Sequence, residues 1–540
     1  MLFPVGCLLL LFSAAVLAKD VETKKPYKFL VFSPQHSNSI VNYMGKISDS
    51  LVDAGHHVTM ISPLIDSKVG TTGTKKAVVI EIPQTPEALK AEEMLTKLQQ
   101  NIWNAQSIWE QYKDGMDMFD DLMNMFLATC KETLHYPGLL ERIRREKIDV
   151  GYAAATDICA FGIFHLAGIT KFVVTQTEAT LPGFYSITHT PDIPSYVPGL
   201  LTPFSEKMTF FERFSNCVGF PVMAYYNDNM FRLTQEVFEV FQPGFPLVSE
   251  IAANSSLIFL NSEPLIDFPR PTTHKIVEIG GIVSSGNFGK LNKTWSDIMD
   301  LRPRTVLLSF GSFAKAHMMP QEYKVAIRDA LSAFPNVTFI WKYEKPEDNV
   351  SGGVPNIIES TWVPQNDMLH DSRLTAFITH CGQCSTTEAN VAGVPMLVIP
   401  IGADQWRNAQ QIKRSGVGLI MDKGQMAEPG FLEGAIRELL DNGSAYRSNA
   451  RRVAQMIADR PFTMKEILVR NMEFVAEYGP LRMLDHYGTK LSFVEFYLID
   501  VFAFLAAIVL ITLTVLAVVA RFVLKKLFGF VRRGGKRKVE

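Results

Sequence analysis

One segment of the chain combines a histidine, a turn of small residues and the start of a helix. The apolar run 374–379 is followed by His380, a turn from Cys381 to Cys384, and a helix that we expect to open at Ser385. A turn of this kind leaves backbone N–H groups free at the positive end of a helix dipole. His380 adds a side-chain donor there, which can stabilise a departing diphosphate without a metal. The pattern therefore predicts a diphosphate-binding site.

The elements that must hold this turn follow a repeated order of strands and helices. The chain opens with a strand at 28–33, a loop at 34–38, a helix to residue 54 and a strand at 57–61, which predicts a parallel sheet. Further strands are expected at 149–155 and 171–175, with helices over most of 85–146 and at 208–231. A second series is expected to begin near residue 255, with strands at 257–260, 304–310, 338–341, 374–379 and 395–399.

Two such series predict two doubly wound α/β domains with a boundary around residues 265–300. In this fold class ligands bind at the carboxyl ends of the strands, in the crevice between the halves. The length of 540 residues also requires more than one hydrophobic core.

Composition excludes several other classes of protein. Apolar residues make up 47% and charged residues 20% of the chain, which excludes a disordered or coiled-coil protein. The formal net charge of −2 gives no indication of nucleic-acid binding. Outside the signal described below, the cysteines are odd in number, so at least one thiol stays outside intramolecular disulfides; they are Cys130, Cys159, Cys217, Cys381 and Cys384.

The two ends of the chain predict a membrane topology. Residues 1–18 have a short apolar core and a small-residue cleavage site, as in a secretion signal. Residues 501–520 carry no charge and are long enough to cross a bilayer as a helix. The tail 521–540 holds eight basic residues against Glu540, which places it in the cytosol and the bulk of the chain in a lumen.

Smaller signals agree with a lumenal location. Lys536 and Lys538 resemble the dilysine signal of endoplasmic-reticulum membrane proteins, although stop-transfer charge alone would also explain them. Five acceptor sequences for N-glycosylation occur, at Asn254, Asn292, Asn336, Asn349 and Asn442.

Residues 362–409, from Trp362 through His380 to Asn408, closely resemble the signature of UDP-glycosyltransferases of the membrane-bound UDP-glucuronosyltransferase type. The resemblance extends to the signal peptide, residues 55–59, 194–199 and 309–312, and the anchor with its basic tail. It implies a fold of two facing Rossmann-like domains, GT-B-like, with one C-terminal transmembrane helix. The implied divisions are a signal at 1–18, an acceptor-binding domain at 19–285, a UDP-sugar-binding domain at 286–445, a helical segment at 446–500, the span at 501–520 and the tail at 521–540.

The resemblance assigns donor-binding roles to individual residues. Trp362 would stack on uracil with Gln365 beside it, although a core tryptophan is the alternative. Glu388 would accept hydrogen bonds from the ribose hydroxyls, but with Ser385 it also fits a capping box. The other residues implied in UDP-sugar binding are Gly311, Ser312, Lys342, His380, Gly382, Gln383, Cys384, Ser385, Asp404, Gln405 and Asn408. No metal or cofactor is implied, and the UDP-sugar is a co-substrate.

Two positions in the donor half depart from the family pattern. Cys381 replaces a glycine, and Lys342 stands where vertebrate members usually have arginine, which has a planar fork that lysine lacks. The sequence Cys381 to Cys384 also matches a CxxC redox motif, but its place after a late strand disfavours that role.

The catalytic pair of the family is replaced as well. The resemblance puts Asn38 at the position of the catalytic histidine and Ala154 at that of its partner aspartate, and neither side chain can take a proton at neutral pH. Three explanations stay open. His36 and Asp157 substitute for the pair, the enzyme uses acceptors such as amines or acidic phenols that need no base, or the chain binds UDP-sugar without turnover as a partner of active enzymes.

We therefore expect an inverting transferase that moves glucuronic acid or glucose from a UDP-sugar to a small lipophilic acceptor at the endoplasmic-reticulum membrane. The methionines and phenylalanines of residues 116–126 suit such an acceptor or form ordinary core. A homo- or hetero-oligomer is compatible with the sequence, which specifies neither the sugar nor the acceptor.

Overall fold

The structure is a computed structural model that describes residues 25–535 except 85, 105–107, 178–184, 189, 285, 287 and 442–444. The expected signal peptide, the Lys536 and Lys538 signal and the acceptor Asn442 lie outside the described residues. The chain divides after Leu484 into two units.

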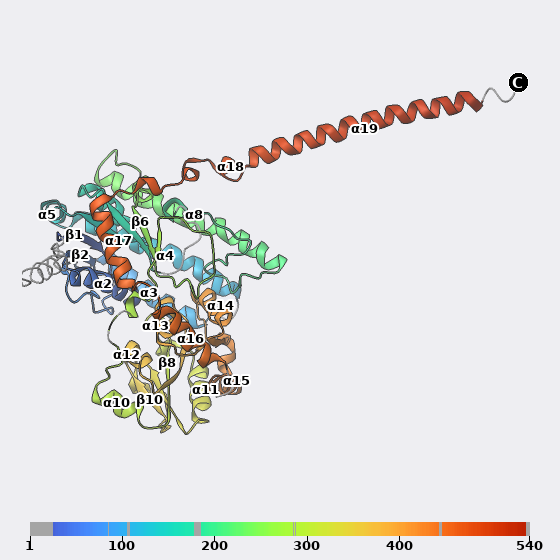
Figure 1. The fold of residues 1–540 in the computed structure, drawn as a ribbon. Coiled ribbons are helices and arrows are strands. Elements are labelled where there is room, and N and C mark those ends of the chain that lie inside the picture. The colour runs from blue at the N-terminus through green and yellow to red at the C-terminus, as the bar shows by residue number, and fades with distance from the viewer. Residues whose placement is uncertain are drawn as a thin grey trace, which may run out of the picture. The chain divides into compact units, whose positions relative to one another are not determined.

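The first unit contains two sheets whose paired strands all run parallel (Figure 1). The first sheet has the order β3-β2-β1-β4-β5-β6-β7. Its strands are β1 Lys28–Phe32, β2 His57–Pro63, β3 Val78–Ile82, β4 Val150–Ala154, β5 Phe172–Gln176, β6 Leu257–Leu260 and β7 Ile276–Glu278. The order reverses beside β1, so the loops after β1 and β4 flank the crevice where this fold class binds ligands.

The second sheet has the order β10-β9-β8-β11-β12-β13. Its strands are β8 Arg304–Ser309, β9 Val337–Lys342, β10 Ile357–Ser360, β11 Leu374–Thr379, β12 Met396–Val398 and β13 Gly418–Ile420. Here the order reverses between β8 and β11, and the turn after β11 is the segment that the sequence marked for diphosphate binding. The fold class of two doubly wound sheets is confirmed.

Helices cover both faces of the first sheet because its strands are apolar on both sides. One face carries α2 (Asn38–Asp53) and α17 (Met464–Tyr478), and the other carries α4 (Ile108–His135), α6 (Cys159–Leu166) and α8 (Phe210–Phe241). The remaining helices of this half are α3 Pro86–Asn104, α5 Leu139–Glu146, α7 Tyr185–Thr188 and α9 Val248–Ala253.

The second sheet is covered in the same way. Its helices are α10 Lys293–Met299, α11 Gln321–Ser332, α12 Gln365–Leu369, α13 Gln383–Ala392, α14 Gln405–Ser415, α15 Pro429–Leu440 and α16 Tyr446–Ala458. The core on the α11 and α15 face also receives Trp103 from α3, which is only 1% exposed and packs edge-on against Phe310. The two halves of the unit therefore share a hydrophobic contact.

The C-terminal part of the first unit returns to the first sheet. Helix α16 packs on α13, whereas α17 packs on α2, β4 and β5, as Figure 1 shows for α17 beside β1, β2 and α2. Leu468, Met472 and Val475 of α17 are completely buried there. This helix thus completes the core of the N-terminal half.

Several expectations about individual elements were wrong or incomplete. The strand at 257–260 was expected to begin the second series, but it pairs with β5 in the first sheet. Strands β3, β7, β10 and β13 were not expected, because short strands give little periodic signal. The helix after His380 begins at Gln383 and not at Ser385, with Gly382 as its N-cap.

The second unit consists of α18 (Phe493–Phe496) and α19 (Ile499–Gly535). Residues Ile499–Phe530 of α19 are long and apolar enough to cross a membrane. This candidate span includes the expected segment 501–520 and continues through Arg521, Lys525 and Lys526.

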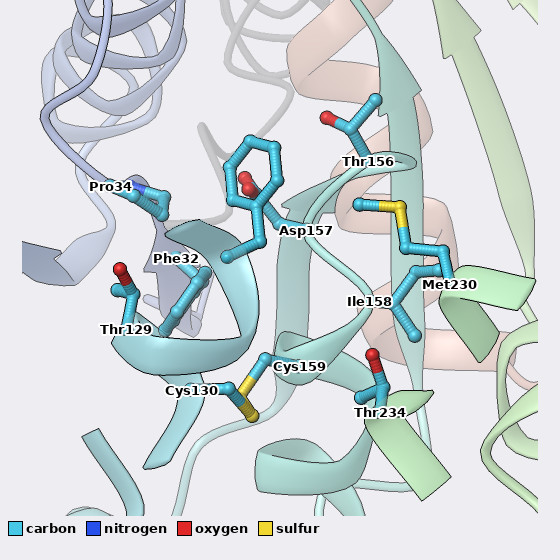
Figure 2. A pocket seen from close by; sticks show the side chains of 11 residues that line it. Phe32, Pro34, Thr129, Cys130, Thr156, Asp157, Ile158, Cys159, Met230 and Thr234 are labelled. Atoms are coloured by element: carbon cyan, nitrogen blue, oxygen red, sulfur yellow. A yellow bond between two sulfur atoms is a disulfide. The ribbon is translucent and has the colours of Figure 1, made fainter. Parts of the chain in front are cut away.

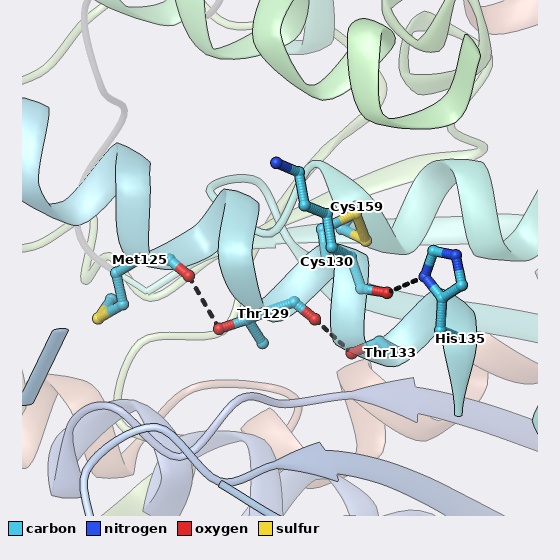
Figure 3. The surroundings of a disulfide bond; sticks show 7 residues. Met125, Thr129, Cys130, Thr133, His135 and Cys159 are labelled. Carbon is cyan, nitrogen blue, oxygen red and sulfur yellow. Dashed lines mark hydrogen bonds between the residues drawn. A yellow bond between two sulfur atoms is a disulfide. The ribbon is translucent and has the colours of Figure 1, made fainter. Parts of the chain in front are cut away.

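The odd number of cysteines required at least one thiol outside intramolecular disulfides, and the structure agrees. Cys130 of α4 and Cys159 at the start of α6 form a disulfide (Figure 3). Cys217 and Cys381 are thiols.

Candidate functional site

The turn after β11 presents the amino end of a helix to the crevice. Gly382 has extended dihedral angles and caps α13 without a side-chain hydrogen bond. The first N–H groups of a helix have no intrahelical partner, so those of α13 are available to an anion. Gly382 makes this arrangement of the turn possible, because a glycine has no side chain and leaves room for the ring of His380.

The His380 imidazole is held between two glycines from different loops. A Cβ atom on Gly311 would lie 2.6 Å from Cε1 of His380, and one on Gly382 would lie 2.6 Å from its Nε2. Gly311 also has φ +81°, which few other residues adopt. Both glycines are therefore required for the ring to occupy this place.

His380 is uncharged at neutral pH. Burial and the positive charge of Lys342 lower the pKa of His380 to about 4. A neutral imidazole keeps one N–H group, which can donate to an oxygen of a bound diphosphate without itself carrying charge.

Lys342 at the end of β9 braces the loop after β8. Its Nζ donates to the carbonyl oxygen of Gly311 at 2.5 Å and lies 3.4 Å from Oε1 of Glu344. The Lys342 side chain therefore brings a positive charge to the Gly311 and Ser312 loop, and it also fixes the backbone of that loop.

Trp362 lies on the surface, as a base-stacking residue must. Its side chain is 60% exposed, and Lys342 Nζ lies 6.0 Å from the ring centroid. The alternative of a core tryptophan is wrong, because only the backbone of Trp362 is held, by the Ser360 hydroxyl at 2.7 Å.

Glu388 and Gln365 form a buried polar pair. Gln365 Nε2 donates to Glu388 Oε2 at 2.6 Å and to Ser385 Oγ at 3.1 Å. Burial raises the pKa of Glu388 to about 7, against the opposing effect of the Gln365 hydrogen bond. The capping-box alternative for Ser385 and Glu388 is wrong, because the N-cap of α13 is Gly382.

The loop before α14 is tied to the turn after β11. Asn408 Nδ2 donates to the carbonyl oxygen of Cys381 at 3.0 Å and to Oδ2 of Asp404 at 2.6 Å. Gln405 Oε1 accepts from the N–H groups of Ile401 and Gly402 at 2.8 and 3.0 Å. Asn408 thus holds the loop, and only the amide nitrogen of Gln405 is left to face a ligand.

Cys381 occupies a backbone conformation that favours glycine. Its φ is +71°, and its buried thiol accepts a hydrogen bond from Thr386 Oγ1 at 3.5 Å. Burial raises the pKa of Cys381 to about 12, so the group stays a thiol. No disulfide joins it to Cys384, and the redox role for this pair receives no support.

The donor half contacts the first sheet through the same turn. Gln383 Nε2 donates to the carbonyl oxygen of Asn261, directly after β6, at 2.7 Å. Asn261 Nδ2 also reaches Cys384 Sγ at 3.8 Å. Gln383 and Cys384 therefore join the two halves.

A buried ion pair joins the halves a second time. Arg407 of α14 is 1% exposed and donates to Oδ1 of Asp267, in the segment between β6 and β7, at 2.7 Å. Gln411 donates to the same oxygen at 2.7 Å, and Arg270 pairs with the other at 3.2 Å. Burial alone would raise the pKa of Asp267, but Arg407 and Arg270 lower it to about 2.

The two positions of the family's catalytic pair lie at the carboxyl end of the first sheet. Asn38 is the first residue of α2, and not a loop residue as expected. Ala154 ends β4 and is 2% exposed. It follows Tyr152 by two residues, so its side chain points to the face that α2 covers.

The proposed substitutes, His36 and Asp157, both lie near Phe126 of α4. His36 packs edge-on against Phe126 of α4 at 5.2 Å and forms a 3.1 Å hydrogen bond with the carbonyl oxygen of Pro34. Burial lowers the pKa of His36 to about 4. Asp157 lies in a small pocket that Phe126 and Pro34 also line (Figure 2).

One oxygen of the buried Asp157 carboxyl lacks a hydrogen-bond partner among the described residues. Asp157 is 3% exposed, its Oδ1 accepts no hydrogen bond, and burial raises its pKa well above the usual range. His36 contacts Phe126, which lines the pocket of Asp157, but the hydrogen bond of the imidazole goes to Pro34 and not to Asp157.

Sequence reasoning missed a second polar group at this edge. Gln176 ends β5, is 1% exposed, and neither its Oε1 nor its Nε2 finds a partner within the described part of the chain. The signal in the sequence that could have identified this residue was a glutamine at the end of the apolar strand 172–176.

Comparison with known proteins identifies the family. The model of the UDP-glucoronosyl and UDP-glucosyl transferase family matches residues 27–534. The chain belongs to this family.

Individual relatives of this glycosyltransferase agree with the assignment. A Caenorhabditis elegans protein named "Putative UDP-glucuronosyltransferase ugt-47" is 28% identical over 488 residues, which cover 88% of this chain and 89% of the relative. Human UDP-glucuronosyltransferase 1A3 is 28% identical over 399 residues, 73% of either chain. The solved glycosyltransferase SnogD from Streptomyces nogalater superposes with a TM-score of 0.55 at 15% identity, over 84% of this chain and all of SnogD. The glycosyltransferase therefore has the GT-B fold.

Proposed function

We propose that this glycosyltransferase moves glucuronic acid or glucose from a UDP-sugar to a small lipophilic acceptor, with inversion at the anomeric carbon. The observation that carries the proposal is the neutral His380 ring held between Gly311 and Gly382 at the amino end of α13. That arrangement offers side-chain and backbone donors at one point and is matched to a diphosphate.

The surrounding residues suit the rest of a UDP-sugar. Exposed Trp362 offers an aromatic face to uracil. The Glu388 carboxyl, already hydrogen-bonded to Gln365, offers acceptor oxygens to ribose hydroxyls. Asp404 and the free amide nitrogen of Gln405 lie next in the same cluster and would bind the sugar.

The reaction would proceed by a single displacement. The acceptor atom attacks the anomeric carbon from the face opposite the diphosphate, the electron pair of the broken bond leaves with UDP, and the proton of the acceptor group passes to water. The N–H group of His380 and the amino end of α13 stabilise the charge that develops on the departing diphosphate. Donors of the protein itself supply this stabilisation, so the proposal involves no metal or cofactor.

The proposed location is the endoplasmic-reticulum membrane with the first unit in the lumen. The apolar helix α19 and the basic residues that follow residue 520 support a type I orientation. The Cys130–Cys159 disulfide favours an oxidising compartment.

A second candidate function is UDP-sugar binding without turnover. It is favoured by the side chains at the catalytic positions, since neither Asn38 nor Ala154 can take a proton from an acceptor hydroxyl. His36, with its pKa of about 4, would be a weak base in its place.

The test uses full-length protein in membranes with labelled UDP-glucuronic acid or UDP-glucose and a panel of alcohols, phenols and amines. We expect product from at least one acceptor class, and a loss of about 100- to 1000-fold in turnover for His380→Ala. His57→Ala, which alters an exposed histidine at the start of β2, is the control and should keep full turnover.

UDP binding without product for any acceptor would favour the second candidate. In that case Asn38→His combined with Ala154→Asp should create turnover on alcohols with little change on amines. Absence of UDP binding by the native chain would refute the whole proposal.

A further inference from the structure

A second pocket opens at the amino-terminal edge of the first sheet. Lys28, Val58 and Val78, which lie at the starts of β1, β2 and β3, line it together with residues from the ends of α2 and α5. The space measures about 320 Å³, within the range of about 300–1,000 Å³ that is usual for small-molecule sites. Because Asn38 and Ala154 lie at the carboxyl edge of the same sheet, this pocket is separate from the crevice that contains the catalytic positions of the family.

One part of the pocket wall is apolar. It consists of Val52 near the end of α2, Val58 and Val78 at the sheet edge, and Ile148 before β4. Val58 is buried, whereas Val78 is 57% exposed, so part of this apolar surface is open to a ligand. An apolar ligand body that covers these side chains gains the free energy of removing both surfaces from water.

Glu146 is the one acidic side chain among the described residues that line the pocket. Its Oε1 accepts from Arg142 Nε at 3.1 Å, and its Oε2 accepts from the Thr59 hydroxyl at 2.8 Å. Both oxygens therefore have partners, and a cationic ligand would have to compete with Arg142 for this carboxylate.

The positive charges of the pocket are less fully matched. Lys28 Nζ donates to the carbonyl oxygen of Glu146 at 2.9 Å and forms no ion pair with a described residue. An ammonium group has three donors, so two remain for a ligand. The second lysine, Lys76, pairs with Asp53, but Lys465 pairs with the same carboxylate at 3.0 Å. The polar groups left over are thus positively charged donors, which favour a ligand that brings a carboxylate.

We propose that this pocket binds a small amphipathic carboxylate. The carboxylate accepts hydrogen bonds from Lys28, and the apolar body of the ligand lies against Val58, Val78 and Ile148. The inference goes beyond the proposed function, because neither the UDP-sugar nor the acceptor occupies this edge of the sheet in that function. It gives the chain a second ligand site, which no step of the transfer reaction uses.

The test compares 4-phenylbutyrate with its uncharged amide, 4-phenylbutanamide, by calorimetric titration of the full-length protein in lipid nanodiscs. The two probes have nearly the same shape and differ in the negative charge. We expect the carboxylate to bind at least about tenfold more tightly, because both partners of its hydrogen bonds to Lys28 are charged. Lys28→Met should remove this preference, whereas Lys131→Met, at an exposed lysine of α4, is the control and should keep it.

A second variant tests the pocket without changing Lys28. Val78→Glu places a carboxylate on the open part of the apolar wall, and like-charge repulsion should weaken the binding of 4-phenylbutyrate more than about tenfold. The binding of the amide should change less, so the preference disappears. Val218→Glu, at a valine of α8 that is 53% exposed, is the matched control and should leave the binding of both probes unchanged.

UDP binding and Tm, measured on the same samples, report whether each variant is folded. Equal affinities of the native chain for the two probes, or a preference for the carboxylate that survives either pocket variant, would overturn the inference and leave the proposed function standing. Loss of UDP binding in the native chain would instead count against the proposed function alone.

Discussion

The ion pair between Arg407 and Asp267 gives the most direct test of how the two halves are held together. We consider Arg407→Met, which keeps most of the side-chain volume and removes the charge. Arg407 is 1% and Asp267 5% exposed, so the change leaves a buried carboxylate with Arg270 as its remaining cation.

The expected cost is large because removing one partner of a buried pair typically costs about 3–5 kcal/mol. For a unit of this size that corresponds to a fall in Tm of roughly 3–5 °C. Arg414→Met on the same helix is the control. Arg414 pairs with Glu206 at 3.0 Å, but both side chains are about one-third exposed, so we expect a loss of at most about 1 kcal/mol.

The assay is thermal unfolding of both variants and of Arg407→Met combined with Asp267→Asn. The double variant should be less destabilised than the sum of the single changes by about 1–3 kcal/mol, because the two groups contact each other. Equal Tm values for Arg407→Met and Arg414→Met would refute the claim that the buried Arg407–Asp267 pair stabilises the contact between the two halves.

Three further predictions concern the donor site. Gly311→Ala should weaken UDP binding more than about tenfold, because its Cβ would lie 2.6 Å from the His380 ring. The control Gly353→Ala has a similar φ of +78° and open space around it, so it should keep UDP binding and lose only about 1–2 kcal/mol of stability. Calorimetry measures the change in UDP binding, and Tm measures the change in stability. Trp362→Ala should weaken UDP binding by about 1–3 kcal/mol with no change in Tm. The control Phe431→Ala, at a side chain that is 51% exposed, should change neither UDP binding nor Tm. A lowered Tm for Trp362→Ala would contradict its surface role. Glu388 holds its proton up to a pH of about 7 when folded and releases it near the ordinary glutamate pKa of 4.5 when unfolded, so its own contribution to native stability should fall by on the order of 3 kcal/mol as the pH rises through this window. The difference in stability between the native chain and Glu388→Gln, followed by pH-dependent Tm measurements, should change by this amount over the same window.

The sequence by itself determined the architecture, because patterns among neighbouring residues indicate the strands and helices. Alternating apolar strands and helices predicted two doubly wound sheets, which the structure confirms. The turn from His380 to Cys384 predicts a diphosphate site, and this stays a prediction. The uncharged run 501–520 predicted the helix that is now a candidate span. These features depend on neighbours in the chain, so they are visible without the tertiary structure.

Only the tertiary structure decided which distant residues meet. An apolar run such as 257–260 does not specify its partner strand, and its pairing with β5 moved it to the first sheet. Segments far away in the chain decide that Trp362 is exposed and that Asp157 is buried with no partner for its Oδ1. The same holds for the contact of Arg407 with Asp267, which are 140 residues apart. Burial and charge pairing are properties of the packed molecule, and they set the pKa values on which the proposed chemistry depends.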